Sequence, residues 1–301
     1  MLYLLLSIVL SVALLLNFRL FPRYKINTFQ AIVFNYPVCF LTGFLFLPNG
    51  QSFSIDFSQT WTWLALGLGV GFIVTFLLSG VSTQRMGLTA TSLANNLSLA
   101  IPVGFSLLVF NSGGKSSFDA LNYLGLGLAV VAVGLSTYKK ESTQTAGGSG
   151  WYALLPLAVF LCYGVTNTLI NYMNLNFIPS ADKTVVVTLT MVVGAIGAGF
   201  LLLAVRLIQG KETIDRRSFV GAITLGVPNF LSFYTLLLAL SAFRGNGAFV
   251  YPLYNIGVIL LAALTAAVLF REQLLTVNKI GLALAVLAIG LISWQEFMGM
   301  F

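Results

Sequence analysis

The sequence predicts an all-α, polytopic membrane protein with ten transmembrane helices arranged as two inverted five-helix repeats. Of its 301 residues, 58% are hydrophobic and 8% are charged, whereas soluble domains carry about a quarter charged residues. Its apolar runs are about 20 residues long, the length that crosses roughly 30 Å of hydrocarbon. The segment GLGLAVVAVGLS at 125–136 returns 156 residues later as GLALAVLAIGLI at 281–292, with eight of twelve letters unchanged.

The elements follow from apolar runs between charged or turn residues. Continuous runs with Gly and Ala favour helices over the alternating pattern of membrane barrel strands. We expect spans at residues 2–21, 28–47, 61–80, 89–110, 119–138, 152–172, 183–207, 218–241, 247–270 and 277–297. A polar linker at 141–150 then separates a first repeat at 1–140 from a second at 151–301, because it is rich in Gly, Ser and Thr.

The basic residues predict the orientation. The first span has no basic residue before it and no small-residue cleavage site, so we expect it to remain as a transmembrane helix. Loops after odd-numbered spans hold twelve Lys and Arg, whereas the other loops hold only Lys115, Lys183 and Arg244. The positive-inside rule therefore predicts an integral protein of the cytoplasmic (inner) membrane with both termini on the non-cytoplasmic side. The net charge of +7 fits contact with anionic membrane lipid and requires no nucleic acid.

The repeat has a structural consequence. Because each half has an odd number of spans, the second half enters the membrane upside down relative to the first. Small residues keep helical spacing in both copies, which lets neighbouring helices approach closely. These residues are Gly125, Ala129 and Ala132 in the first copy, and Gly281, Ala285 and Ala288 in the second.

The segment FREQLLTVNKIGLALAVLAIGLISW at 270–294 resembles the closing signature of the EamA-type branch of the drug/metabolite transporter superfamily. Glu272, Leu275 and Gly281 stand where that signature places them. The resemblance implies a permease for small metabolites, with a central cavity formed by spans one to four and six to nine. Spans five and ten would pack as outer support. We expect Glu272, at a helix end, to act as a structural tether or a gate contact.

Polar residues inside the spans are the candidate solute-binding residues, because an inverted repeat places its site near the midplane between its halves. Tyr and Asn are costly to bury in a membrane, although such residues also serve as hydrogen-bonding links between helices. Span six carries a polar stripe at four-residue spacing, and spans four and nine carry clusters near prolines. The candidates are Asn35, Tyr36, Asn95, Asn96, Ser98, Tyr163, Asn167, Asn171, Asn229, Tyr251, Tyr254 and Asn255.

The missing residue types narrow the function. No acidic or basic residue falls in the middle of a predicted span, which disfavours a proton antiporter and favours a neutral or zwitterionic, amino-acid-like solute. The chain has no His, the commonest general base and metal ligand, and Cys39 and Cys162 lie in different spans. We therefore expect no cofactor, no metal and no enzymatic activity. A polar-lined channel remains the alternative, and the protein is expected to be a monomer or a homodimer.

Overall fold

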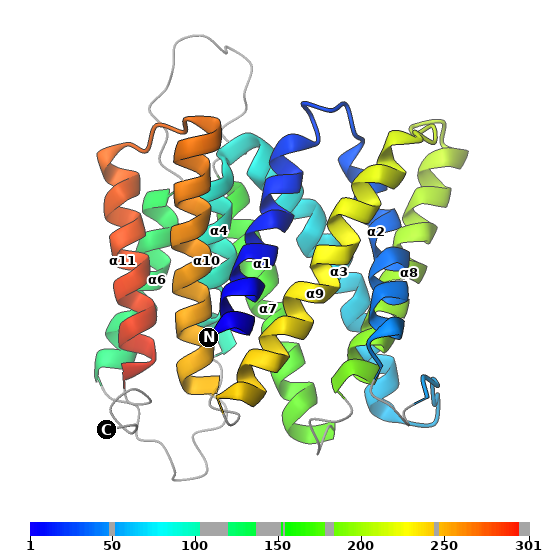
Figure 1. Cartoon of the computed structure of the whole chain (residues 1–301), viewed down its shortest axis with the longest axis horizontal. Helices are drawn as coiled ribbons and strands as arrows, with labels where there is room; N and C mark the ends of the chain where they lie inside the picture. Colours follow the sequence, from blue (N-terminus) through cyan, green and yellow to red (C-terminus); the bar gives the residue numbers. More distant parts are fainter. Residues whose placement is uncertain are drawn as a thin grey trace.

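The computed structural model describes residues 1–47, 52–102, 120–136, 152, 154–177, 184–243 and 247–294. All regular secondary structure in these residues is helical. Within these residues, ten helices run side by side, up and down (Figure 1). They are α1 (Leu2–Leu20), α2 (Thr28–Leu45), α3 (Thr60–Met86), α4 (Leu88–Leu97), α6 (Ala120–Ser136), α7 (Leu155–Phe177), α8 (Thr184–Ile208), α9 (Arg217–Ala242), α10 (Gly247–Phe270) and α11 (Thr276–Ile292).

The expected membrane character is confirmed. Seven helices are long and apolar enough to cross a bilayer: α1, α2, α3, α7, α8, α9 and α10. Two further apolar helices, α6 and α11, have 17 residues each. Helix α4 ends at Leu97, and a turn at 98–99 separates it from a helical segment at 100–102, where the described part of the chain stops. The predicted linker at 141–150 lies outside the described residues.

The main helix contacts join the first half of the chain to the second. Helix α2 packs on α9, α3 packs on α8, and α1 packs on both α9 and α10. Helices α3 and α8 touch through their backbones: a Cβ atom on Gly69 would lie 2.3 Å from the Met191 carbonyl oxygen, and one on Gly194 would lie 2.2 Å from the Leu66 carbonyl oxygen. Only glycine permits such an approach, so these two positions fix the distance between the two helices.

Helices α6 and α11 form a pair at one side of the molecule (Figure 1). The small residues predicted to face a close neighbour do so. Ala129, Ala132, Ala285 and Ala288 are fully buried and belong to one apolar cluster with residues of α4, α7 and α10. Close packing of small side chains therefore attaches this pair to the rest of the bundle.

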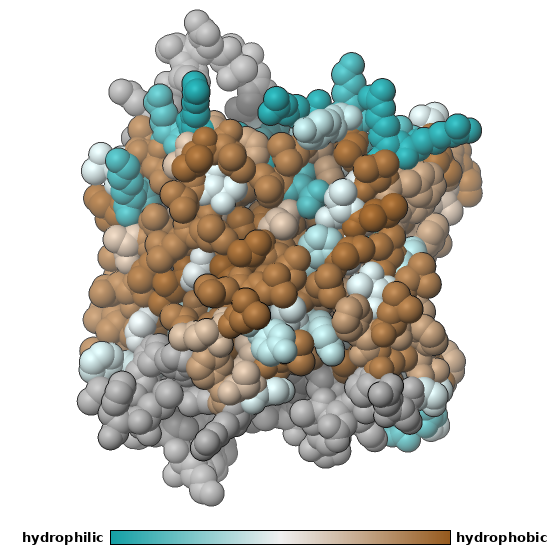
Figure 2. Space-filling model, viewed as in Figure 1, coloured by the Kyte–Doolittle hydropathy of each residue, from teal (hydrophilic) through white to brown (hydrophobic). Residues whose placement is uncertain are grey.

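The two ends of the bundle differ in charge. Within the described chain, all ten Lys and Arg residues lie at the end where α1, α3, α8 and α10 finish, together with Glu212, Asp215 and Glu272. We call this end the charged end; its hydrophilic side chains stand above a continuous hydrophobic band in Figure 2. Helix α1 begins and α11 finishes at the opposite end. Asp56 is the one charged residue described there.

Candidate functional site

A central cavity of about 290 Å³ lies between helices from both halves of the chain. Its wall comes from α2 and α3 on one side and from α7, α8, α9 and α10 on the other. None of the described residues that form the wall carries a charge. The lining residues are Tyr36, Cys39, Phe72, Thr75, Phe76, Tyr163, Thr166, Asn167, Ile170, Val187, Thr188, Met191, Val192, Asn229, Phe230, Phe233, Leu237 and Tyr251.

The cavity extends toward one end of the bundle. Val187 and Thr188 lie three and four residues after Thr184, where α8 begins at the end opposite the charged end. Leu237 is five residues from the end of α9 on that side, and Tyr251, four residues into α10, is 44% exposed. Toward the charged end, the lining residues stop at least eight residues from the end of each helix. The cavity therefore reaches the end opposite the charged end and stops near the middle of the bundle.

Most of the polar lining residues lie in the inner part of the cavity, where it stops near the middle of the bundle. Tyr36 lies eight residues after Thr28, where α2 begins, and Tyr163 lies eight residues after Leu155, where α7 begins. Asn229 Nδ2 donates to Asn35 Oδ1 at 3.0 Å, which orients its amide from α9 toward α2. Tyr36 is 1% exposed, and its hydroxyl group has no hydrogen-bond partner.

Prolines place three of these side chains next to helix irregularities. Tyr36 precedes Pro37, Asn229 follows Pro228, and Tyr251 precedes Pro252, all inside helices. A proline has no N–H group, so the carbonyl four residues earlier loses its helical partner. Asn17 of α1 donates to that carbonyl at Thr224 through Nδ2 at 3.0 Å. The proline in α9 thus creates a point of attachment for α1.

A layer of hydrogen bonds behind the wall supports the polar residues. Ser98 Oγ donates to the Asn95 carbonyl at 2.6 Å and accepts from Asn167 Nδ2 at 3.2 Å. Ser79 Oγ contacts Asn95 Oδ1 at 3.3 Å and the Tyr163 hydroxyl at 3.4 Å. Asn95 and Ser98 therefore lie outside the cavity wall: Ser98 bonds directly to Asn167 of the wall, and Asn95 is linked to Tyr163 through Ser79.

Five of the twelve predicted residues line the cavity: Tyr36, Tyr163, Asn167, Asn229 and Tyr251. The others lie elsewhere. Asn35 and Asn96 are buried and donate to backbone carbonyls within their own helices, at Ile32 and Ser92. Tyr254 bonds to Ser11 at 2.7 Å and joins α10 to α1.

Asn255 and Asn171 complete the set. Asn255 is 5% exposed and lies outside the cavity wall. Asn171 lies one helical turn beyond Asn167 on α7 and is exposed on the surface of the bundle. The four-residue spacing of the predicted stripe was regular, but the cavity faces only its first part.

The apolar part of the wall was not predicted. Phe233 and Leu237 lie four and eight residues after Asn229, on the same face of α9. Helical spacing from a predicted polar residue was therefore the signal that could have identified them. Helix α8 had no predicted site residue, yet it supplies Val187, Thr188, Met191 and Val192.

Glu272 links helices at the charged end. From the turn after α10, its carboxylate accepts from the Leu88 backbone N–H at 3.1 Å and from Thr89 Oγ1 at 3.4 Å. Arg19 Nη2 of α1 lies 3.7 Å from its Oε1. These contacts join α10 to α1 and to the start of α4, so Glu272 is a tether across the halves.

Gly87 makes this tether possible. It connects α3 to α4 with φ 101° and ψ 167°, a conformation that is essentially restricted to glycine. A Cβ atom at this position would also lie 2.7 Å from Glu272 Oε1. The backbone conformation therefore requires glycine, and any side chain here would also displace the Glu272 carboxylate.

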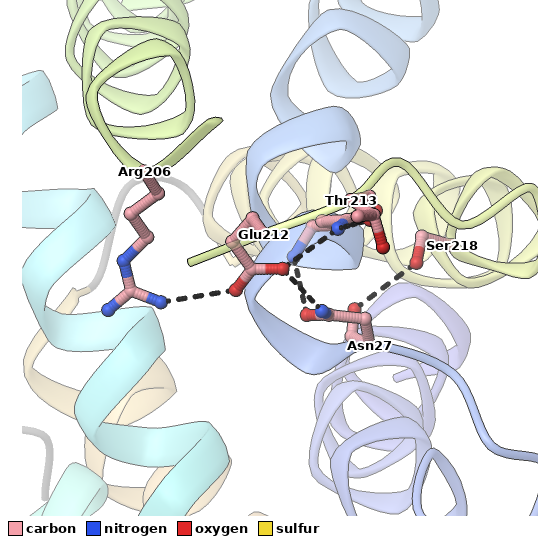
Figure 3. Close-up of polar contacts among 6 residues, drawn as sticks. Asn27, Arg206, Glu212, Thr213 and Ser218 are labelled. Carbon is pink, nitrogen blue, oxygen red and sulfur yellow. Dashed lines mark hydrogen bonds and ion pairs between the residues drawn. The ribbon is translucent and has the colours of Figure 1, made fainter. Parts of the chain in front are cut away.

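A second carboxylate joins the halves at the same end (Figure 3). Glu212 Oε2 accepts from Asn27 Nδ2 at 2.8 Å and from Gln30 Nε2 at 3.0 Å, while Oε1 lies 3.3 Å from Arg206 Nη1. Gln30 is fully buried and also donates to the Thr213 carbonyl at 2.7 Å. The loop between α8 and α9 is thus attached to the start of α2.

Another hollow, of about 410 Å³, lies on the outside of the bundle between α1 and α9. Half of its eight lining residues are aliphatic or phenylalanine, namely Leu20, Phe21, Ile26 and Val220, and Arg217 contributes at the charged end. It opens on the outer side of α1 and α9, and none of the twelve predicted site residues lines it. The central cavity is therefore the better candidate for a solute site. Among the described residues, no cluster of three His, Cys, Asp or Glu could hold a metal ion.

Comparisons with known proteins extend the fold assignment but not the chemistry. No family model matches the chain. A protein of Haemophilus influenzae, described as uncharacterized, is 26% identical over 290 residues, which cover 94% of each chain. A solved crystal structure is similar over 97% of this chain and 98% of its own, with a TM-score of 0.56 and 16% identity. The chain therefore has the same overall fold as that solved protein, along its whole length.

Proposed function

We propose that the protein is a transporter of the cytoplasmic membrane that moves a small neutral or zwitterionic, amino-acid-like solute by alternating access. The observation that carries this proposal is the central cavity: uncharged, partly polar, formed by both halves, extending to one end and closed at the other. A neutral wall with a few oriented amides and hydroxyls suits a solute whose net charge is zero.

An inverted repeat of five helices accounts for the arrangement. Helices α6 and α11 are offset by 156 residues at both ends, and α2 and α8 begin 156 residues apart. The same offset converts the contact between α2 and α9 into the contact between α8 and α3. Two related halves facing opposite directions supply the two alternative arrangements that alternating access requires.

The charged end is proposed to face the cytoplasm, because it holds all ten described Lys and Arg residues. The cavity would then reach the non-cytoplasmic side. This arrangement corresponds to an outward-facing state, in which the contacts of Glu272 and Glu212 hold the cytoplasmic end closed.

Counterflow in proteoliposomes tests the transport proposal. Proteoliposomes that contain the purified protein and are loaded with an unlabelled neutral amino acid should accumulate the labelled amino acid from outside. The initial rate of uptake should saturate as the concentration of the amino acid rises. A panel of glycine, serine, leucine, phenylalanine, glutamate and lysine identifies the accepted class. Flux that rises linearly with concentration and shows no counterflow would instead identify a channel.

Two asparagines on α7 provide matched variants for this assay. Asn167→Ala removes an amide from the cavity wall and should raise the apparent KM, whereas Asn171→Ala removes an exposed amide one turn away and should leave it unchanged. Equal effects of the two substitutions would mean that Asn167 acts only as a link between helices.

Cysteine labelling in intact cells tests the orientation. In a background with Cys39→Ala and Cys162→Ala, Leu237→Cys in the outer part of the cavity should react with a membrane-impermeant maleimide added outside. Lys211→Cys, exposed at the charged end, should react only after the membrane is permeabilised. The reverse pattern would invert the proposed topology.

A further inference from the structure

We propose that the solute is amphipathic: its polar end binds at the inner part of the cavity and accepts a hydrogen bond from the Tyr36 hydroxyl, while its apolar body lies toward the open end. This inference rests on the proposed transport function and specifies the class of solute. It also gives the solute one orientation in the outward-facing state.

The lining residues change character along the cavity. The inner part is lined by Tyr36, Tyr163 and Asn229, with Thr75 and Thr166 beside them. The outer part is mostly apolar: beside Thr188 and Tyr251 it is lined by Ile170, Val187, Met191, Phe233 and Leu237. A solute with polar groups at both ends would leave one end against apolar side chains, at the cost of unmade hydrogen bonds.

The volume and the aromatic wall set the size of the apolar body. At about 290 Å³ the cavity is near the lower limit for small-molecule sites, roughly 300 to 1,000 Å³. Seven of its eighteen lining residues are aromatic. This wall offers a branched aliphatic or aromatic side chain extensive contact, which glycine or serine could not make.

Tyr36 supplies the specific polar contact. Buried hydroxyl groups nearly always have a partner, since an unmade hydrogen bond is costly. The Tyr36 hydroxyl has none in this state, although its residue forms part of the cavity wall and its ring lies 5.8 Å from that of Phe76. A carboxylate or carbonyl oxygen of the solute would satisfy this donor with a modest shift of the side chain.

The amino-acid panel tests the solute class directly. In proteoliposomes, leucine and phenylalanine should show apparent KM values at least about tenfold below those of glycine and serine, because their side chains bury apolar surface. Glutamate and lysine should compete poorly. Equal preference for serine and leucine would overturn the amphipathic assignment, while counterflow itself would still support transport.

Tyr36→Phe tests the polar contact, with Tyr172→Phe as the matched control on the exposed surface of α7. Tyr36→Phe should raise the apparent KM for leucine about 2- to 10-fold, the effect of one lost hydrogen bond. Without solute its melting temperature should stay unchanged or rise, since an unpartnered group is removed. The stabilisation by added leucine should shrink.

Two results would overturn the role of Tyr36. The first is a lower melting temperature of Tyr36→Phe without solute, combined with unchanged solute-induced stabilisation, which would make the hydroxyl purely structural. The second is an unchanged KM in a variant that folds normally. By contrast, counterflow with no member of the panel by the wild-type protein would count against the proposed function itself.

Discussion

The two ends of the bundle use similar carboxylates in different ways. Glu212 and Asp56 are 156 residues apart, the offset of the proposed repeat. Glu212 bonds to Asn27 and Gln30 across the halves, whereas the Asp56 carboxylate bonds to Ser58 of its own loop, to the backbone N–H at 3.0 Å and to Oγ at 2.6 Å. The carboxylate at the charged end therefore joins the two halves of the chain, whereas the one at the opposite end bonds within its own loop.

Replacing Gly87 should destabilise the charged end most. Gly87→Ala forces a side chain into a glycine-only conformation, which costs about 1 to 3 kcal/mol, and it displaces the Glu272 carboxylate. Thermal unfolding in detergent should show a clear drop in melting temperature. Gly67→Ala is the control, because a Cβ atom there meets nothing within 4 Å; it should be neutral or slightly stabilising. Equal melting temperatures for the two variants would remove Gly87 from the tether.

Glu272→Gln should have the next largest effect. Hydrogen bonds to a charged group contribute about 1.5 to 3 kcal/mol, and the ion pair with Arg19 adds little. The glutamine amide would keep part of this stabilisation. We expect a loss of about 1 to 2 kcal/mol in the free energy of unfolding. Maleimide labelling of Leu237→Cys should also decrease, because the outward-facing state loses its closing contact. Increased labelling would contradict the proposed closing role.

Glu212→Gln should cost less, about 1 kcal/mol, since Asn27 and Gln30 both donate to Oε2 and the amide oxygen of glutamine can take that place. Arg206 contributes little, because its side chain is 48% exposed. Arg206→Gln should therefore leave the melting temperature within error of wild type. If it destabilised the protein as much as Glu212→Gln, the ion pair rather than the amides would hold this loop.

Asp56→Asn, at the end opposite the charged end, should have the smallest effect. The hydrogen bonds from Ser58 hold the pKa of the Asp56 carboxyl below its usual value. A lowered folded-state pKa means that any stabilisation is present above the unfolded-state pKa and is lost as pH falls through the folded-state pKa. Because the group is fully exposed, wild type and variant should show the same melting temperature between pH 7 and pH 3. A difference in melting temperature that appears only at neutral pH would mean that the Asp56 carboxylate makes a stabilising contact.

The sequence predicted the helices and the unequal charge of the two ends of the bundle, because both depend on residues that are close together in the chain. The span predicted at 247–270 has the bounds of α10, and those at 2–21 and 28–47 differ from α1 and α2 at one end only. The end of α4 at Leu97 was missed. Asn95 and Ser98 bond there to neighbouring groups, and no run of apolar letters indicates such an interruption.

The candidate site was harder to predict than the helices. Asn167 and Asn171 are four residues apart and lie on the same side of α7. Only Asn167 lines the cavity, because the neighbours of α7 change along its length. Which side of a helix meets a cavity depends on contacts with residues far away in the chain: Ser98, which bonds to Asn167, is 69 positions away, and Ser79, which bonds to Tyr163, is 84 positions away. The Glu212 contacts with Asn27 and Gln30 illustrate the same limit, since no short motif relates them.

Membrane voltage acts only on charge, at about 2.3 kcal/mol per elementary charge for each 100 mV. The central cavity has no charged side chain among its described lining residues, so a solute of zero net charge would cross without carrying current. Under the proposed mechanism, such a cycle neither draws on the electrical potential nor works against it. Concentration differences of the solute, or of a neutral exchange partner, would then set the direction of movement.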